Sequence, residues 1–207
     1  AGCAVALPST RPRTTGGAPP RLTDGLRYLF AAPKLRWLAL SVALLNLAYA
    51  QFQSGLPLKV LGSPRGGFDL GLYWALSGLV CLVLGVFVEG LIAKLGQLRV
   101  LLGGTAGLGV GFIIVGFTDD RWLLGFGTAL TGCLVLINVV TVSYRQSVVP
   151  DHLLGRVTAA YRLLAFGALP LGSLVAAGVL AAWNVDAVIL MAALPVCASA
   201  VLFTLAY

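Results

Sequence analysis

Residues 37–58 of the chain read WLALSVALLNLAYAQFQSGLPL and contain no charged side chain, although Arg36 and Lys59 flank them directly. A helix needs about 20 apolar residues to cross the ~30 Å hydrocarbon layer of a bilayer, and this stretch is long enough. Five more uncharged stretches of similar length follow, at residues 70–88, 100–118, 122–144, 163–185 and 187–207. None shows the short apolar–polar alternation of a membrane β-strand. The sequence therefore predicts an all-α membrane protein with six transmembrane helices.

The composition agrees with this prediction. Of the 207 residues, 59% are hydrophobic and only 10% are charged, whereas soluble domains carry roughly 25% charged residues. So few charges cannot solvate the surface of a globular enzyme in water. A disordered chain is excluded as well, because disorder requires low hydrophobicity and high charge. The lipid bilayer is the first partner that such a chain requires.

The Lys and Arg residues indicate how the six spans are oriented. With the N-terminus in the cytoplasm, the segments 1–36, 89–99 and 145–162 lie inside and hold eleven of the fourteen cationic side chains. Only Lys59, Arg65 and Arg121 then lie outside. Because cytoplasmic loops carry an excess of Lys and Arg, both termini are predicted to be cytoplasmic, in the inner or plasma membrane of the cell. The net charge of +7 reflects this topology and indicates no nucleic-acid partner.

The segment before the first span differs from the rest in composition. Residues 1–7 are an apolar stub, residues 8–20 are a linker rich in Pro, Gly, Thr and Arg, and residues 22–30 form an amphipathic stretch expected at the membrane surface. Because the stub resembles the end of a preceding membrane helix, we expect the chain to be a fragment; a short independent leader is the alternative. The domains are then residues 1–36 and a six-helix bundle at 37–207.

Polar side chains recur at helical spacing in the first and fourth spans, with two more in the second. Polar groups in hydrocarbon need partners or a wet cavity, so we expect these side chains to line a substrate cavity, with the third and sixth spans facing lipid. Alternatively the amides only bond neighbouring helices, which contributes about 0.6 kcal/mol each on average. The cavity candidates are Asn46, Tyr49, Gln53, Tyr73, Ser77, Thr131, Asn138 and Thr141.

Prolines and glycines inside two spans predict places where a helix can bend. A proline removes one helical hydrogen bond and clashes with the preceding turn, and such bends occur in transporters that rock as well as in plain helix packing. The bending candidates are Pro57 in the first span and Gly167, Pro170 and Gly172 in the fifth.

Chemistry-bearing residues are absent from the middle of every span. No Asp, Glu, Lys or His lies there, and His152, the single histidine, has no second candidate ligand nearby. Cys81, Cys133 and Cys197 lie in spans and Cys3 stands alone, which predicts neither a disulfide framework nor a zinc site. No phosphate-binding loop is present. We therefore predict no enzymatic activity, no catalytic residue, no metal and no cofactor.

The connection between the fourth and fifth spans carries a family resemblance. It contains Arg145-Gln146, Pro150, the triplet 155–157 (Gly-Arg-Val) and the stretch 167–172 (Gly-Ala-Leu-Pro-Leu-Gly). In this order the motifs resemble the C-terminal half of a major facilitator superfamily transporter, in particular the enterobactin-exporter-like branch. The similarity covers roughly residues 21–182. In the loop after the second span, Lys94, Gly96 and Arg99 fit the superfamily signature, whereas Ala93 occupies its acidic position.

The resemblance implies one six-helix half-bundle of a twelve-helix exporter that works by alternating access. Its partners would be a small-molecule substrate (a drug or a siderophore) and the missing N-terminal half. It also implies an inner gate, with Glu89 as a substitute for the acid that Ala93 replaces. The gate candidates are Glu89, Lys94, Gly96, Arg99, Arg145, Pro150, Gly155, Arg156 and Arg162. A self-standing six-helix protein with a structural or accessory role, or two copies pairing as one transporter, are the alternatives.

Overall fold

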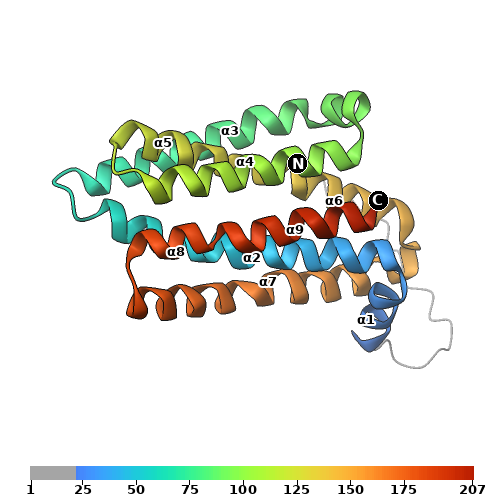
Figure 1. Cartoon of the computed structure of the whole chain (residues 1–207). Helices are drawn as coiled ribbons and strands as arrows, with labels where there is room; N and C mark the ends of the chain where they lie inside the picture. The colour runs from blue at the N-terminus through green and yellow to red at the C-terminus, as the bar shows by residue number, and fades with distance from the viewer. Residues whose placement is uncertain (1–21) are drawn as a thin grey trace, which may run out of the picture.

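The computed structural model describes residues 22–207, which are helical apart from short connections (Figure 1). The elements are α1 (Leu22–Ala31), α2 (Pro33–Val60), α3 (Gly66–Leu95), α4 (Gln97–Phe117), α5 (Arg121–Ala129), the 3₁₀ turn η1 (Leu130–Cys133), α6 (Leu134–Val148), α7 (Asp151–Ala182), α8 (Val185–Met191) and α9 (Ala193–Ala206). The apolar stub, the linker and Cys3 lie outside the described residues.

Six helical units are long and apolar enough to cross a membrane: α2, α3, α4, the continuous run Arg121–Val148, α7 and the run Val185–Ala206. Each contains one of the predicted spans or nearly all of it. They lie side by side as a bundle, with their connections at its two ends (Figure 1). The predicted all-α architecture with six spans is therefore confirmed.

The helix that contains the fifth span, predicted at 163–185, begins about a dozen residues before it. Helix α7 begins at Asp151 and ends at Ala182, so much of the expected loop is helix. Arg156 and Arg162 precede the apolar stretch. Long charged side chains near the end of a span are compatible with a helix, because they can extend to the membrane–water interface. Helix α8, which follows, is capped by Asn184 rather than by Asp186, because the Asn184 side chain accepts a hydrogen bond from the Ala187 backbone nitrogen at 2.9 Å.

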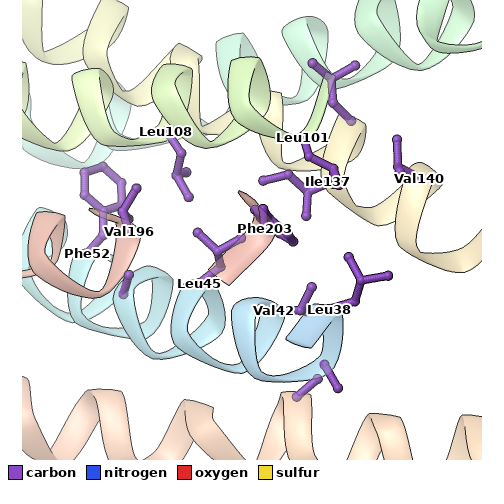
Figure 2. Close-up of a cluster of buried hydrophobic side chains, with 14 of the residues drawn as sticks. Leu38, Val42, Leu45, Phe52, Leu101, Leu108, Ile137, Val140, Val196 and Phe203 are labelled. Atoms are coloured by element: carbon purple, nitrogen blue, oxygen red, sulfur yellow. The ribbon is translucent and has the colours of Figure 1, made fainter. Parts of the chain in front are cut away.

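The helices pack around α2, which contacts α7, α8 and α9. Phe52 on α2 stacks on Phe112 of α4, with ring centroids 4.6 Å apart, and Leu45, Leu108 and Phe203 fill the same core (Figure 2). Between membrane helices such contacts stabilise by close packing rather than by removal of apolar surface from water. The core thus ties α2, α4 and α9 into one layer.

The prediction that the third span faces lipid needs correction. Half of the most apolar window of α4 is buried inside the bundle, against 11% for α3 and 33% for Val185–Ala206. Helix α4 is buried because its glycines allow neighbouring helices to approach closely. Gly111 of α4 lies against Gly127 of α5, where a Cβ would lie 2.9 Å from the Gly111 carbonyl oxygen. The most outward-facing span is α3, which exposes large apolar residues such as Phe68, Leu82 and Phe87.

The amphipathic stretch predicted at 22–30 forms helix α1. Leu29 is fully buried, whereas the neighbouring Phe30 is 45% exposed. The helix packs on α7, where an ion pair joins Asp24 to Arg156 at 3.8 Å and Gly25 lies against the Arg156 backbone. Helix α1 is thereby fixed to the bundle at the end where α3 meets α4 and α6 meets α7 (Figure 1).

Candidate substrate cavity

A cavity of about 670 Å³ lies between α2, α6 and α7, and we refer to it as the polar cavity. Three α-helices contribute polar side chains at three- and four-residue intervals, which places them on one face of each helix. Its polar lining consists of Asn46, Tyr49, Gln53 and Ser54 from α2, Asn138, Thr141 and Arg145 from α6, and Tyr161, Arg162 and Ser173 from α7. Its apolar wall includes Leu134, Val142, Phe166 and Leu169.

Five of the eight cavity candidates named from the sequence are therefore brought together. Of these, Asn46 also serves the alternative role, because its Nδ2 atom donates a hydrogen bond to the Ala165 carbonyl oxygen of α7 at 2.9 Å. The Thr141 hydroxyl donates to the Ile137 carbonyl of its own helix at 2.8 Å. Gln53 and Asn138 are exposed at the cavity. The Asn46 side chain thus lines the cavity and also forms a hydrogen bond to a neighbouring helix.

Three candidates lie elsewhere. Ser77 and Thr131 form a buried hydrogen bond to each other at 2.8 Å, between α3 and η1. Their approach depends on Gly132, where a Cβ would lie 2.8 Å from the Cys81 backbone nitrogen. Near the N-terminal end of α3, the Tyr73 hydroxyl donates a hydrogen bond to the Arg121 carbonyl oxygen at 2.8 Å. These side chains hold α3 to the α5–η1 segment and do not line the polar cavity.

Arg145 is the more buried of the two charged side chains in the cavity lining, with 5% of its surface exposed. Its guanidinium carbon lies 4.2 Å from the centre of the Tyr161 ring, within range of a cation–π contact. Its Nε and Nη1 atoms, and the Tyr161 hydroxyl, are buried and find no hydrogen-bond partner within residues 22–207. The cavity thus contains a cation and a phenol that lie close together, and two nitrogens of the cation make no hydrogen bond to the described residues.

Tyr161 was missed by the sequence analysis because residues 145–162 were expected to be a loop. On a helix, Tyr161, Ala165, Leu169 and Ser173 follow one another at four-residue steps, and all four line the cavity. That periodicity is visible in the sequence once α7 is extended to Asp151.

The gate candidates divide into three groups. Arg145 and Arg162 line the polar cavity. Pro150 directly precedes α7, and its carbonyl oxygen accepts hydrogen bonds from the Leu153 and Leu154 nitrogens. Arg156 pairs with Asp24 of α1. The remaining candidates lie on the surface in α3, at the α3–α4 turn or in the first turns of α4 and α7. They are Glu89, Lys94, Gly96, Arg99 and Gly155.

Gly96 makes the sharp turn between α3 and α4 with φ +82°, a conformation that L side chains rarely adopt. Beside this turn, the Tyr207 hydroxyl donates to Gln97 Oε1 at 2.7 Å. Burial, with the nearby phenol of Tyr144, raises the pKa of Tyr207 to about 12, so the phenol stays protonated and remains a donor at neutral pH. Lys34 lies over the same ring at 3.4 Å and ties the start of α2 to this end.

The four bending candidates lie inside uninterrupted helices. Pro57 is within α2, and Gly167, Pro170 and Gly172 are within α7. Gly172 is a packing residue: a Cβ there would lie 2.8 Å from the Ala50 Cβ and still closer to the Leu47 carbonyl oxygen of α2. Gly167 has open space beside it.

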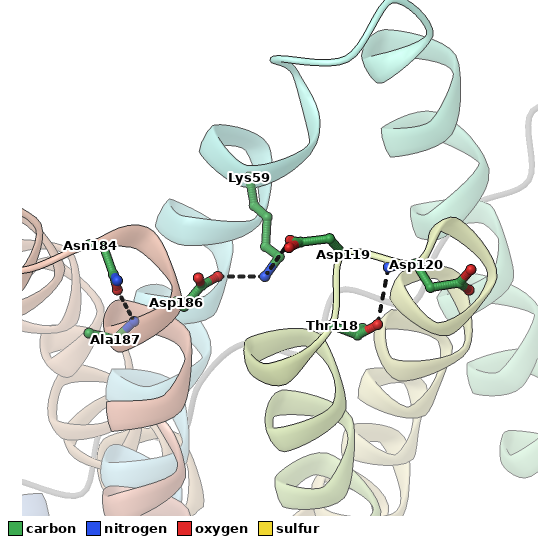
Figure 3. Close-up of polar contacts among 7 residues, drawn as sticks. All are labelled: Lys59, Thr118, Asp119, Asp120, Asn184, Asp186 and Ala187. Carbon is green, nitrogen blue, oxygen red and sulfur yellow. Dashed lines mark hydrogen bonds and ion pairs between the residues drawn. The ribbon is translucent and has the colours of Figure 1, made fainter.

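A second set of polar residues, which we call the charged rim, lies where α2 ends and α3 begins. Lys59, whose side chain is 5% exposed, contacts Asp186 at 2.5 Å and Asp119 at 3.2 Å, and so joins α2 to α8 and to the α4–α5 connection (Figure 3). Arg121 pairs with Asp69 at 2.8 Å. A smaller cavity of about 400 Å³ lies among these residues. The sequence placed these charges at span ends but did not indicate that they pair.

The arrangement contains no cluster suited to a metal: within residues 22–207 no group of three or more His, Cys, Asp or Glu side chains is placed to hold an ion. What it does offer is a partly polar cavity of about 670 Å³ among membrane-spanning helices, which is the architecture of a multi-pass membrane transporter.

Comparison with known proteins identifies the family. Residues 4–172 match the model of the Major Facilitator Superfamily, so the chain belongs to this superfamily of membrane transporters. No curated protein and no solved structure matches the chain.

Proposed function

We propose that this chain is a six-helix bundle of an exporter of the enterobactin-exporter-like branch, equivalent to the C-terminal half of a twelve-helix transporter. The substrate would be a small molecule such as a drug or a siderophore, moved outward by alternating access. The observation that carries the proposal is the polar cavity, whose three walls come from α2, α6 and α7. A second six-helix bundle would face this cavity and complete the site.

Alternating access requires each bundle to move as a unit about a central site. The charged rim supports this because Lys59 links three segments at one end of the bundle. The packed core between α2, α4 and α9 supports it along the bundle's length. The polar cavity then supplies the surface that changes its exposure when the two bundles rock.

We further propose that α1 and the α3–α4 and α6–α7 connections face the cytoplasm of an inner or plasma membrane. These connections lie together at one end of the bundle (Figure 1), and the sequence concentrates Lys and Arg there. At this end Lys94, Arg99, Arg156 and Arg162 would contribute to the inner gate, with Glu89 as its acidic member.

The proposal is tested by efflux from cells that express the full protein as encoded by its gene. We expect expression to lower the accumulation of at least one dye in a panel that includes cationic and anionic dyes, such as ethidium, rhodamine 6G, Hoechst 33342 and fluorescein. Asn138→Leu removes a polar side chain from the cavity and should change the rate or the dye preference, with membrane insertion intact. Ser143→Leu is the matched control, since Ser143 is exposed on the same helix and does not line the cavity.

Two outcomes would contradict the proposal. If expression changes the accumulation of no dye, an export function loses its support. If Asn138→Leu and Ser143→Leu both transport as the wild type does, the α6 face of the cavity takes no part in transport. Transport by vesicles that contain residues 1–207 alone as a monomer would contradict the requirement for a second bundle.

A further inference from the structure

Arg145 carries a charge that its surroundings do not compensate. Its side chain is 95% buried, and two of its nitrogens have no acceptor among the described residues. An arginine cannot relieve this by losing its proton, because a guanidinium stays charged in proteins. A buried charge without a partner destabilises a protein unless something pairs with it in the working state.

The acidic residues of the chain do not supply that partner. None of them lines the polar cavity, whereas a second arginine, Arg162, does. The pairs that the structure shows for carboxylates lie elsewhere: Asp69 with Arg121, Asp119 and Asp186 with Lys59, and Asp24 with Arg156. The cavity is thus positively charged, while carboxylates at both ends of the bundle are engaged with other cations.

Tyr161 strengthens the case for an anion at this place. Its ring lies beneath the Arg145 guanidinium, and its buried hydroxyl lies near Arg145 and Thr141 without a well-formed hydrogen bond to either. Hydrogen bonds from an arginine and a phenol to one oxyanion are charge-assisted and stronger than neutral ones. Phe166 and Leu169 meanwhile provide an apolar wall for the rest of a ligand.

We infer that Arg145, together with the Tyr161 hydroxyl, binds an oxyanion, such as a carboxylate, on the transported molecule. The substrate class is therefore a small organic acid with an apolar body, rather than a neutral or cationic molecule. The inference rests on the proposed function, because it assigns a substrate class to the same cavity. Two other sources of the same chemistry are a carboxylate of a second bundle and the phosphate of a membrane lipid, and the experiment distinguishes them.

The test uses dansylglycine and dansylglycinamide, which have nearly the same size and differ in a carboxylate against an amide. The full protein is placed in nanodiscs of phosphatidylcholine, and dansyl fluorescence gives both dissociation constants. We expect the acid to bind at least about tenfold more tightly than the amide, as a hydrogen-bonded ion pair commonly provides. Arg145→Gln should abolish this preference and Arg145→Lys should keep part of it.

Arg36→Gln is the matched control, because it removes an arginine from the same end of the bundle that lines none of the cavities. It should keep the full preference for the acid. Tyr161→Phe should lower the preference by a few fold, and it keeps the inference testable if Arg145→Gln fails to fold.

Equal binding of acid and amide to the wild type would overturn the inference, and so would a preference that survives in Arg145→Gln. If a carboxylate of a second bundle already neutralises Arg145, the wild type should bind the acid and the amide equally. Addition of phosphatidylglycerol should leave the affinity for dansylglycine unchanged; a large loss would assign Arg145 to a lipid phosphate and overturn the inference. The proposed function is tested separately by the efflux assay. Export of neutral or cationic dyes that depends on Asn138 would support the proposed function even if Arg145 binds no acid.

Discussion

The charged rim and the polar cavity both contain buried cations, yet the two regions treat them differently. At the rim, Lys59 has two carboxylates within 3.2 Å, and Arg121 has Asp69 at 2.8 Å. In the cavity, Arg145 is equally buried and has a tyrosine ring beneath it but no carboxylate. A paired charge holds helices together, whereas an unpaired one is kept for a ligand. This difference distinguishes the charged rim, which stabilises the bundle, from the polar cavity, which we propose binds the substrate.

The largest expected effect on stability comes from Lys59. Replacing it by Met leaves Asp119 and Asp186 facing each other without their common cation. Breaking a fully buried pair costs about 3–5 kcal/mol, but these carboxylates are partly exposed to solvent, so we expect a loss of about 2 kcal/mol in the free energy of unfolding. Thermal unfolding of the purified protein measures it. Lys59→Arg should recover most of the loss, and a Lys59→Met protein as stable as the wild type would deny the rim its structural role.

A smaller effect is expected from the glycines of α7, which lie on two different surfaces. Gly172→Ala places a methyl group against Ala50 and the α2 backbone, and overpacking of this kind costs about 1–2 kcal/mol. Gly167→Ala meets open space and should leave stability unchanged or raise it by up to about 1 kcal/mol, because alanine favours a helix. The same thermal unfolding assay compares the two variants. Equal stability of both would show that α7 does not pack on α2 as closely as the structure indicates.

The fold could be predicted from the sequence because membrane spans depend on length and hydrophobicity, which are local properties. The amphipathic pattern of α1 was equally local. The start of α7 could not be predicted from charges, since Arg156 and Arg162 lie on a helix that begins before the apolar stretch. Asn46, Gln53 and Asn138, which the sequence analysis selected by helical spacing, line the polar cavity, whereas Ser77 and Thr131 bond to each other between helices.

Contacts between distant segments were the part that the sequence did not provide. Lys59, Asp119 and Asp186 belong to helix α2, the α4–α5 connection and helix α8, which are far apart in the chain, and only the fold brings them together (Figure 3). Arg145 was expected at a gate because of its place after the fourth span. Its burial over Tyr161 depends on how α6 packs beside α7, which no motif encodes.

The most direct test of the contrast between rim and cavity is the thermal unfolding of Arg145→Met, measured beside Lys59→Met without any ligand. Methionine keeps much of the packing volume of arginine and removes a charge that has no partner. We predict that Arg145→Met unfolds with a free energy within about 1 kcal/mol of the wild type, or higher, while Lys59→Met is clearly destabilised. A loss for Arg145→Met as large as that for Lys59→Met would show that Arg145 holds the structure together, and would contradict the account.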